Sequence, residues 1–372
     1  MILKNWEVTG VWFNTGRKMR VTVFGSSHGL GVGMTMEGIP PGTSIDLEEI
    51  KKALERRKPQ SSDISTGRKE DDSFEILSGI KGNITDGSPI TVFIRNKDIR
   101  SGDYGNLKFT PRPGHADYPA MVKYKEGYDE RGGSFFSGRM TAPLVICGAI
   151  CYELLKREGI TIGSHIYSIE KIKDKAFDPV TLTKEQLSLL NREFFPLVDK
   201  GKEKEMKELI KSVKEDKDSL GGIIECGVTG LSPGLGSPRF MGLDSLIGAV
   251  MFSIPGVKGV EFGSGFRGTA FRGSRNNDQY RIKEGRVVAL KNNAGGVLGG
   301  LSTGMPLLFR VAFKPVASIG REQKTVNLKT MKETVIRVEG RHDPCIVPRA
   351  ASVVEAACAI CLYDEMRYEG LL

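Results

Sequence analysis

The chain has 372 residues, of which 39% are hydrophobic and 27% are charged, and its net charge at pH 7 is +9. This composition is typical of a globular protein and excludes a disordered or fibrous chain. The positive charge favours an anionic partner, which could be a nucleic acid or a small substrate held among arginines.

The N-terminus and the cysteines indicate a cytoplasmic protein. The first 18 residues contain no continuous apolar stretch and no small-residue cleavage site, so we expect no secretory signal. No apolar run reaches the roughly 18 to 20 residues that a bilayer span needs, so we expect no membrane association. The six cysteines form no regular framework, which is typical of free thiols in a reducing compartment.

The first part of the chain predicts a glycine-rich loop, a helix and then strands. The loop is 24–33, "FGSSHGLGVG", and it contains His28. Residues 45–57 predict a helix, because Asp46 can cap it and apolar residues recur on one face. Residues 74–94 alternate apolar and polar side chains around glycine-rich turns, as strands do.

The rest of the chain predicts two apolar helices with a charged segment between them. Residues 141–157 predict a mostly buried helix, and residues 348–367 predict another. Residues 170–218 are rich in Lys and Glu, which predicts a solvated helix in a peripheral insertion. Residues 221–268 return to apolar segments punctuated by glycine. Because helices and strands do not alternate strictly, the pattern indicates an α/β or α+β protein and not a doubly wound sheet.

Two patterns resemble known motifs but lack the expected surroundings. The segment 263–268, "GSGFRG", has the spacing of a dinucleotide-binding loop, but no amphipathic helix follows it. A zinc-like spacing is formed by His342, Cys345, Cys358 and Cys361. The last two lie inside a predicted apolar helix, where cysteine behaves as a small hydrophobic residue. We therefore predict no metal site.

His28 and His115 are the candidates for acid–base chemistry, although each alone could equally be structural. His115 lies in "RPGHAD", between a Pro-Gly pair and an aspartate, and imidazole exchanges protons near neutrality because its unperturbed pKa is about 6.5. His165 lies on an apparent strand, and we predict a structural role for it.

Arginine suits bidentate recognition of phosphate and carboxylate. The basic residues within or beside glycine-, proline- and serine-rich segments are Arg56, Arg57, Lys58, Arg68, Arg112, Arg131, Arg139 and Arg341. The residues alone thus predict an enzyme for a polyanionic ligand without identifying its reaction.

A series of blocks in a fixed order resembles the chorismate synthase family. The blocks include "FGSSHG", "LERRKP", "FTPRPGHADY", "NNAGGVLGGLSTGMPL" and "GRHDPC", and the similarity runs from about residue 11 to about residue 363. The resemblance implies an α+β fold of the β-α-β sandwich type. It also implies a single large domain over 11–372, with an N-terminal extension at 1–10 and the charged peripheral insertion at 170–218.

The same resemblance implies a phosphate lyase of the shikimate pathway, which serves aromatic amino-acid biosynthesis. Such enzymes convert 5-enolpyruvylshikimate 3-phosphate to chorismate and phosphate by a 1,4-anti elimination that requires reduced FMN but has no net redox change. The difficult step belongs to the cofactor, and the protein supplies binding and proton management. The resemblance further implies a homotetramer that depends on an external flavin reductant, with no nucleic-acid or membrane partner.

The resemblance assigns catalytic roles to three residues. His115 manages protonation of the reduced flavin, His28 assists the leaving phosphate, and Asp343 lies near the flavin N5. The implied FMN-binding residues are Ser137, Pro255, Gly256, Gly299, Lys314, Pro315, Val316, Ala317, Ser318 and Arg341. The implied substrate-binding residues are Ser27, Arg57, Arg68, Arg112 and Arg139.

Several positions depart from the family pattern, and they affect the expected FMN and substrate contacts. Ser26 replaces a common carboxylate, and Asp63 stands where many members have an anion-binding arginine. An arginine, a serine and a glutamate of the family are replaced by Phe135, Phe136 and Met140.

Two other functions remain open from the sequence. The first is flavin reduction with NADPH, which some relatives combine with the synthase activity. The second is RNA binding, which the positive charge allows. However, aromatic residues make up only 8% of the chain and no RNA-recognition stacking motif is present, so the sequence does not favour it.

Overall fold

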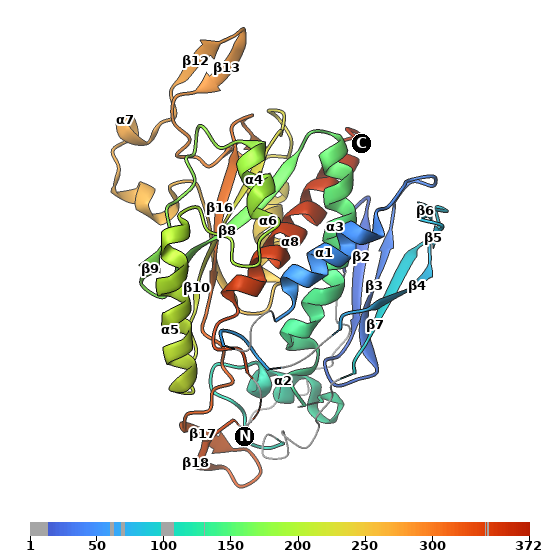
Figure 1. Cartoon of the computed structure of the whole chain (residues 1–372), viewed down its shortest axis with the longest axis vertical. Coiled ribbons are helices and arrows are strands. Elements are labelled where there is room, and N and C mark those ends of the chain that lie inside the picture. Colours follow the sequence, from blue (N-terminus) through green and yellow to red (C-terminus); the bar gives the residue numbers. More distant parts are fainter. Residues whose placement is uncertain are drawn as a thin grey trace.

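Two antiparallel sheets enclose a layer of long helices (Figure 1). The computed structural model describes residues 14–59, 63–67, 71–97, 108–129, 131–338, 340 and 342–372. This arrangement confirms the predicted α+β fold of the β-α-β sandwich type in a single domain.

The first sheet has five strands, in the spatial order β1 (Asn14–Thr15), β2 (Arg20–Gly25), β3 (Gly31–Glu37), β7 (Ile90–Arg95) and β4 (Phe74–Ser78). The second sheet also has five, in the order β11 (Val257–Phe262), β16 (Leu307–Phe313), β10 (Gly222–Thr229), β8 (Thr161–Ile169) and β9 (Ile172–Lys173). Four two-stranded hairpins are formed by β5 (Ile80–Lys81) with β6 (Ile84–Thr85), β12 (Tyr280–Lys283) with β13 (Arg286–Ala289), β14 (Val297–Leu298) with β15 (Leu301–Ser302), and β17 (Gln323–Asn327) with β18 (Lys332–Ile336).

The described α-helices are α1 (Leu47–Arg57), α2 (Asp117–Tyr124), α3 (Thr141–Arg157), α4 (Lys184–Leu190), α5 (Glu203–Glu215), α6 (Leu243–Phe252), α7 (Gly273–Asn276) and α8 (Val347–Tyr368). The predicted helices at 45–57, 141–157 and 348–367 are therefore confirmed as α1, α3 and α8. Helices α1, α3 and α8 form the middle layer, in which α3 contacts the first sheet and α8 contacts the second.

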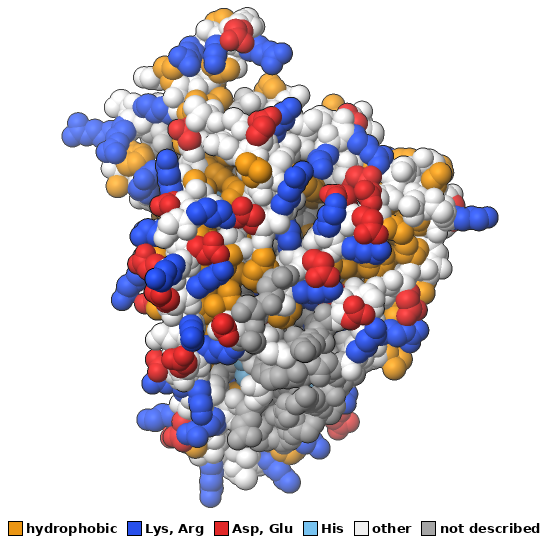
Figure 2. Space-filling model, viewed as in Figure 1, with side chains coloured by type: hydrophobic (Ala, Val, Ile, Leu, Met, Phe, Trp, Pro, Cys, Tyr) orange, Lys and Arg blue, Asp and Glu red, His pale blue; other side chains and the backbone are white. Residues whose placement is uncertain are grey.

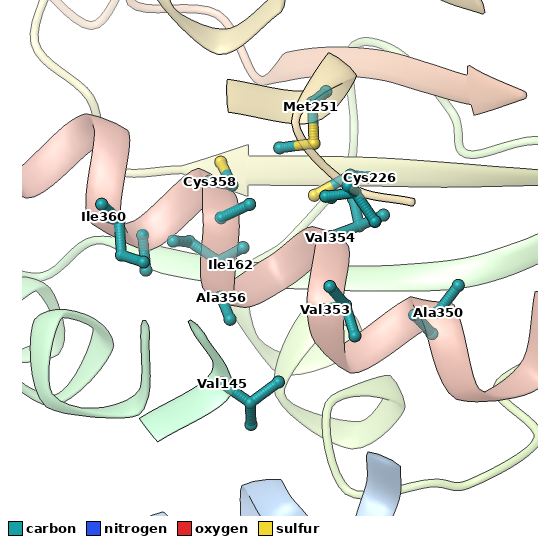
Figure 3. Close-up of a cluster of buried hydrophobic side chains, with 14 of the residues drawn as sticks. Val145, Ile162, Cys226, Met251, Ala350, Val353, Val354, Ala356, Cys358 and Ile360 are labelled. Carbon is teal, nitrogen blue, oxygen red and sulfur yellow. The ribbon is translucent and has the colours of Figure 1, made fainter. Parts of the chain in front are cut away.

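Small side chains let α3 and α8 approach closely. A Cβ added to Gly148 of α3 would lie only 2.2 Å from the Cβ of Ala356 on α8. Figure 3 shows Ala356 directed towards Val145 of α3, whereas Cys358 lies on the side of α8 that meets Cys226 of β10. Because α8 is covered on both sides, it is apolar nearly all round, as a central helix must be.

The apolar helix α3 belongs to this core. Together with the turn before it, Gly138–Arg157 is long and apolar enough to cross a membrane, although we expected no run of that length. Because 67% of its most apolar window is buried inside the fold, α3 is a core helix covered by the first sheet and α8.

Helix α1 brings a basic side chain into the interior. The side chain of Asp46 accepts a hydrogen bond from the backbone N–H of Glu48, which caps the helix as predicted. Ile50 and Leu54 are buried on its inner face, and Arg57 at its C-terminal end is only 2% exposed. The helix therefore presents the guanidinium of Arg57 inside the molecule and not to solvent.

The charged segment 170–218 contains β9, α4 and α5. Its long helix α5 exposes a Lys- and Glu-rich face, but Met206 and Ile210 on the opposite face are fully buried. Helix α4 packs on the outer face of β8. Of these two helices, only α4 lies on the side of the second sheet opposite α8, because Met206 and Ile210 of α5 belong to the same hydrophobic core as α8.

Candidate active site

A cavity of about 890 Å³ lies where the end of α1, the start of α8 and several loops meet. Small-molecule sites typically measure roughly 300–1,000 Å³, so the cavity is large enough for a sizeable ligand. The loops that contribute are 112–119, 132–141, 252–258 and 313–318. The predicted site residues that line it are Arg57, Arg112, His115, Ser137, Arg139, Pro255, Gly256, Lys314, Pro315, Val316, Ala317, Ser318 and Asp343.

Three predicted residues lie away from this lining. Ser27 and His28, in the turn between β2 and β3, are buried behind Gly132, which does line the cavity. Gly299 lies on the exposed turn between β14 and β15, where a left-handed φ of +62° favours glycine without any ligand. The structure therefore does not bring Gly299 together with the other predicted flavin contacts. The predicted residues outside the described part of the chain are Arg68 and Arg341.

Asp117 binds the Nδ1 side of the His115 ring. The Asp117 carboxylate is buried, and its Oδ1 lies 2.6 Å from His115 Nδ1. Arg112 donates to the same carboxylate from Nε at 2.7 Å and from Nη2 at 2.8 Å, and its Nη1 donates to Ser318 Oγ at 3.0 Å. Burial opposes ionisation, but the hydrogen bonds from Arg112 and His115 outweigh it and hold the pKa of Asp117 far below its usual value. Arg112 therefore supports His115 as well as lining the cavity.

A pair of glycines contacts both candidate histidines. A Cβ on Gly132 would lie 2.0 Å from His28 Cε1, and a Cβ on Gly133 would lie 3.1 Å from His115 Nε2. Both glycines adopt a left-handed φ, at +61° and +104°. Because neither glycine has a side chain, the backbone of Gly132 and Gly133 can pack directly against the imidazole rings of His28 and His115. Ser27 Oγ lies 3.1 Å from His28 Nδ1 on the other side.

Arg57 and Arg139 share one buried carboxylate. Asp72 accepts a hydrogen bond from Arg57 at 2.5 Å and another from Arg139, and all three side chains are at least nine-tenths buried. Burial alone would raise the pKa of Asp72, but the two guanidinium groups hold it below the usual value. Arg139 also donates to Asn96, whose amide binds the backbone of the His28 turn. The two arginines are thus fixed at the cavity wall before any ligand binds.

Asp343 is paired with an arginine that the sequence reasoning missed. Its Oδ1 accepts from the backbone N–H of Thr66 at 2.9 Å, and its Oδ2 accepts from Arg349 on α8. Arg349 also donates to the carbonyl oxygen of Arg57 at 2.8 Å. Asp343 is therefore a carboxylate held in a defined orientation at the edge of the cavity.

Two lysines, Lys314 and Lys258, line one wall of the cavity. Lys314 Nζ donates to the carbonyl oxygen of Gly114, and its backbone N–H donates to the carbonyl oxygen of Gly256 at 3.0 Å. Burial and the neighbouring ammonium group of Lys258 lower the pKa of Lys314. In the part of the chain that the structure describes, no carboxylate forms an ion pair with either lysine. This wall is therefore suited to an anionic ligand group.

The aromatic departures from the family pattern form one wall of the cavity. Phe135 and Phe136 both line it, with their ring centroids 4.6 Å apart. Tyr124 packs edge-on against Phe135 at 5.2 Å, and Tyr128 lies 6.4 Å from Phe136. The wall is apolar where an arginine and a serine were expected from the family pattern.

The other departures do not reach the cavity. Asp63 is exposed and Met140 is buried elsewhere, so neither lines the cavity wall. Ser26 contributes its carbonyl oxygen to Asn96. Asp63 therefore does not take the place of an anion-binding residue in the cavity lining.

His165 and the two cysteines of α8 are buried in the fold and do not line the cavity. His165 is buried in β8 between Asp174, at 2.8 Å, and Glu225, at 2.9 Å, which fits the predicted structural role. Cys358 and Cys361 are buried on α8. Among the described residues, no group of three or more His, Cys, Asp or Glu side chains is arranged to hold a metal ion.

The fold and the cavity together define an enzyme of the β-α-β sandwich type with a basic, histidine-containing site. Residues 19–366 match the family model described as chorismate synthase. The chain therefore belongs to the chorismate synthase family, whose members are lyases.

Relatives and a solved structure agree with this assignment. The chain is 45% identical to the chorismate synthase of Pyrococcus abyssi, over 95% of this chain and 97% of that protein. It is 42% identical to the chorismate synthase of Lancefieldella parvula, over 94% of this chain and 95% of that protein. A crystal structure of chorismate synthase superposes with a TM-score of 0.71 at 33% identity, covering 95% of this chain and 93% of that one.

The sequence reasoning missed four charged residues of the site. Asp117 stands two residues after His115 in "RPGHAD", and this spacing was its only local signal. Asp72 meets Arg139 across 67 residues, and Arg349 meets the carbonyl oxygen of Arg57 across 292, although its carboxylate partner Asp343 is only six residues away. Lys258 lies in "PGVKG", just after the predicted flavin positions Pro255 and Gly256.

Proposed function

We propose that this chain converts 5-enolpyruvylshikimate 3-phosphate to chorismate and inorganic phosphate by a 1,4-anti elimination with reduced FMN. This reaction serves the shikimate pathway to aromatic amino acids. The observation that carries the proposal is a single cavity that combines fixed arginines, an oriented histidine and two lysines without carboxylate partners in the described chain. Membership of the chorismate synthase family supports it.

The cavity residues fit a reduced flavin. Gly256 has a left-handed φ of +93° and no side chain, so a planar ring can approach its backbone closely. Lys314 and Lys258 provide positive charge for a phosphate, and the aromatic wall of Phe135 and Phe136 excludes water. When bound, reduced FMN would supply the transient electron density that the elimination needs, without net redox change.

The arginines are placed to bind the polyanionic substrate. Arg57 and Arg139 line the same wall and are held by Asp72, so their orientation does not have to be set during binding. The arginines would thus stabilise the phosphate and carboxylate charges of the substrate. They would also stabilise the charge that develops on the leaving phosphate.

The two histidines would manage protons in this reaction. His115 lines the cavity and takes or releases a proton there. His28 lies behind Gly132 with its Nδ1 next to Ser27, and assists the phosphate as it leaves. Asp343, oriented by Arg349, is the carboxylate that the family resemblance places near the flavin N5.

An anaerobic assay with photoreduced FMN tests this function. The enolpyruvyl substrate should yield chorismate and phosphate in equal amounts, and the flavin should remain reduced at the end. A parallel reaction with oxidised FMN and NADPH should yield no chorismate, because we propose that the flavin is reduced by an external partner. Phosphate release without FMN, or no chorismate with photoreduced FMN, would contradict the proposal.

We also propose that the protein assembles as a homotetramer, as its family resemblance implies. Light scattering of the purified protein should give four times the chain mass of 40.7 kDa. A mass equal to one chain would refute the assembly without affecting the proposed reaction.

A further inference from the structure

Asp117 accepts several hydrogen bonds beside the cavity, and the proposed reaction does not assign it a role. Its Oδ2 accepts from the backbone N–H of Arg112 at 3.0 Å and from Arg112 Nε at 2.7 Å. Its Oδ1 accepts from Arg112 Nη2 at 2.8 Å and from Tyr128 Oη at 3.0 Å, and lies 2.6 Å from His115 Nδ1. The whole residue is 0% exposed. A carboxylate with this many donors is fixed in position and remains ionised.

The ionised state of Asp117 determines which nitrogen of His115 carries a proton. A carboxylate can only accept hydrogen bonds, so the 2.6 Å contact requires a proton on His115 Nδ1. Arg112 Nη2 lies 3.1 Å from the same Nδ1, but a guanidinium can only donate. Two donors do not bond to each other, and the shorter contact to Asp117 is therefore the hydrogen bond. The neutral ring then has its lone pair on Nε2.

We propose that Asp117 is a positioning residue for the proposed reaction: it holds His115 in the Nδ1-protonated tautomer, so that protons are exchanged with a ligand only at Nε2. The carboxylate also balances the positive charge of the imidazolium when Nε2 gains a proton. This inference rests on the proposed function for its catalytic consequence, but the tautomer itself does not depend on any substrate.

The main alternative is that Asp117 only neutralises Arg112. Arg112 uses Nε and Nη2 on Asp117 and Nη1 on Ser318, so removal of Asp117 would leave a buried guanidinium without its carboxylate. Loss of stability or activity in a variant would therefore not separate the two roles. The protonation state of the His115 ring does separate them.

The experiment is ¹⁵N NMR of protein labelled at histidine, recorded over a pH range that includes the neutral ring. Only four histidines are present, and the His115→Gln variant assigns the signals of His115. In the wild-type protein without ligands, Nδ1 should carry the proton and Nε2 should show the shift of an unprotonated nitrogen. In Asp117→Asn, the amide can no longer anchor this tautomer by charge, and the ring should shift towards the Nε2-protonated form.

Kinetics with photoreduced FMN complete the test. Asp117→Asn should lower kcat by about 10²- to 10⁴-fold, the usual contribution of a general acid or base, and should change KM far less. Asp86→Asn, which makes the same change in an exposed turn, should leave both values unchanged.

Two results would overturn the proposal. A wild-type His115 protonated at Nε2 would do so directly, and this measurement does not require any variant to fold. An unchanged tautomer in a folded Asp117→Asn protein would do so as well. If no chorismate forms in any variant, the proposed function fails, but the tautomer result still decides the role of Asp117.

Discussion

At the scale of residues, the cavity is built from cations that buried aspartates hold in place. Asp72 holds Arg57 and Arg139, and Asp117 holds Arg112 together with His115. Buried charges are expensive unless they are paired and hydrogen-bonded. The aspartates therefore explain how several positive groups can line one cavity before an anionic ligand arrives.

Asp72→Asn should lower the free energy of unfolding by about 3 kcal/mol, because it breaks a buried ion pair and leaves two buried guanidinium groups without a counter-charge. Chemical denaturation measures this change. The neighbouring Asp71→Asn is a matched control: Asp71 is exposed and pairs with Lys97 on the surface, at 3.0 Å, where such pairs contribute about 0–1 kcal/mol. Equal effects of the two variants would show that Asp72 is not a buried anchor.

Gly132→Ala should reduce kcat by about 10²-fold, since its Cβ would overlap the His28 ring and small displacements of catalytic groups have effects of this size. Steady-state kinetics with reduced FMN measure the change. Gly127→Ala serves as the control, because a Cβ at Gly127 meets nothing within 4 Å. Similar turnover in the two variants would remove His28 from the mechanism.

The sequence predicted the site histidines but not the distant partners of Arg139 and Asp343. His28 and His115 stand out because glycine and proline surround them, and the family resemblance supplied most of the cavity wall. The link between Arg139 and Asp72 crosses 67 residues of chain, and the one between Asp343 and Thr66 crosses 277. Contacts of this kind arise from tertiary packing, which local patterns do not encode.

At the scale of elements, the middle helices decide how closely the two sheets can stack. The boundaries of α1, α3 and α8 followed from apolar periodicity and caps, because these signals are local. The pairing of strands could not be predicted from these local signals, because β10 pairs with β8 and with β16, which lie far apart in sequence. The burial of Met206 and Ile210 on α5 was likewise hidden by the surrounding lysines and glutamates.

Gly148→Ala should destabilise the protein by about 1–3 kcal/mol, because the new methyl group would overlap the backbone and side chain of Ala356 and force α3 away from α8. Gly248→Ala in α6 is the matched change in open space, and it should stabilise by about 0.5–1 kcal/mol through helix propensity alone. Thermal and chemical unfolding measure both. Effects of the same sign would contradict close packing at Gly148.

The buried His165 network should make stability fall as the pH rises above about 6.5. Burial alone would lower the pKa of His165, but hydrogen bonds with Asp174 and Glu225 raise it overall, and Arg310 and Glu261 extend the network. A raised pKa stabilises the fold fully below the unfolded value of about 6.5, and this contribution disappears as pH rises through the folded value. Unfolding midpoints across this range should decline in wild type and stay flatter in His165→Gln. Identical slopes would show that another group titrates.

At the scale of the whole molecule, the basic residues lie in two different settings, the exposed surface and the buried cavity. Figure 2 shows Lys and Arg interspersed with Asp and Glu over the face in view, and not gathered into one basic strip. Exposed pairs such as Lys202 with Glu205, at 2.9 Å, account for part of the surface charge. The arginines at the cavity are buried and oriented instead. Net charge alone could not distinguish these two groups, because it does not depend on where each residue lies in the fold.

The most direct test of the account is a binding titration of 5-enolpyruvylshikimate 3-phosphate in the presence of oxidised FMN, which prevents turnover. If the cavity is the polyanion site, Arg139→Ala should weaken binding by about 1.5–3 kcal/mol, the range for a hydrogen bond to a charged group. Arg139→Lys should restore it only in part, because an ammonium group lacks the bidentate fork. The exposed control Lys202→Ala should bind like the wild-type protein. If Arg139→Ala binds as tightly as Lys202→Ala, the cavity is not the substrate site and the account is wrong.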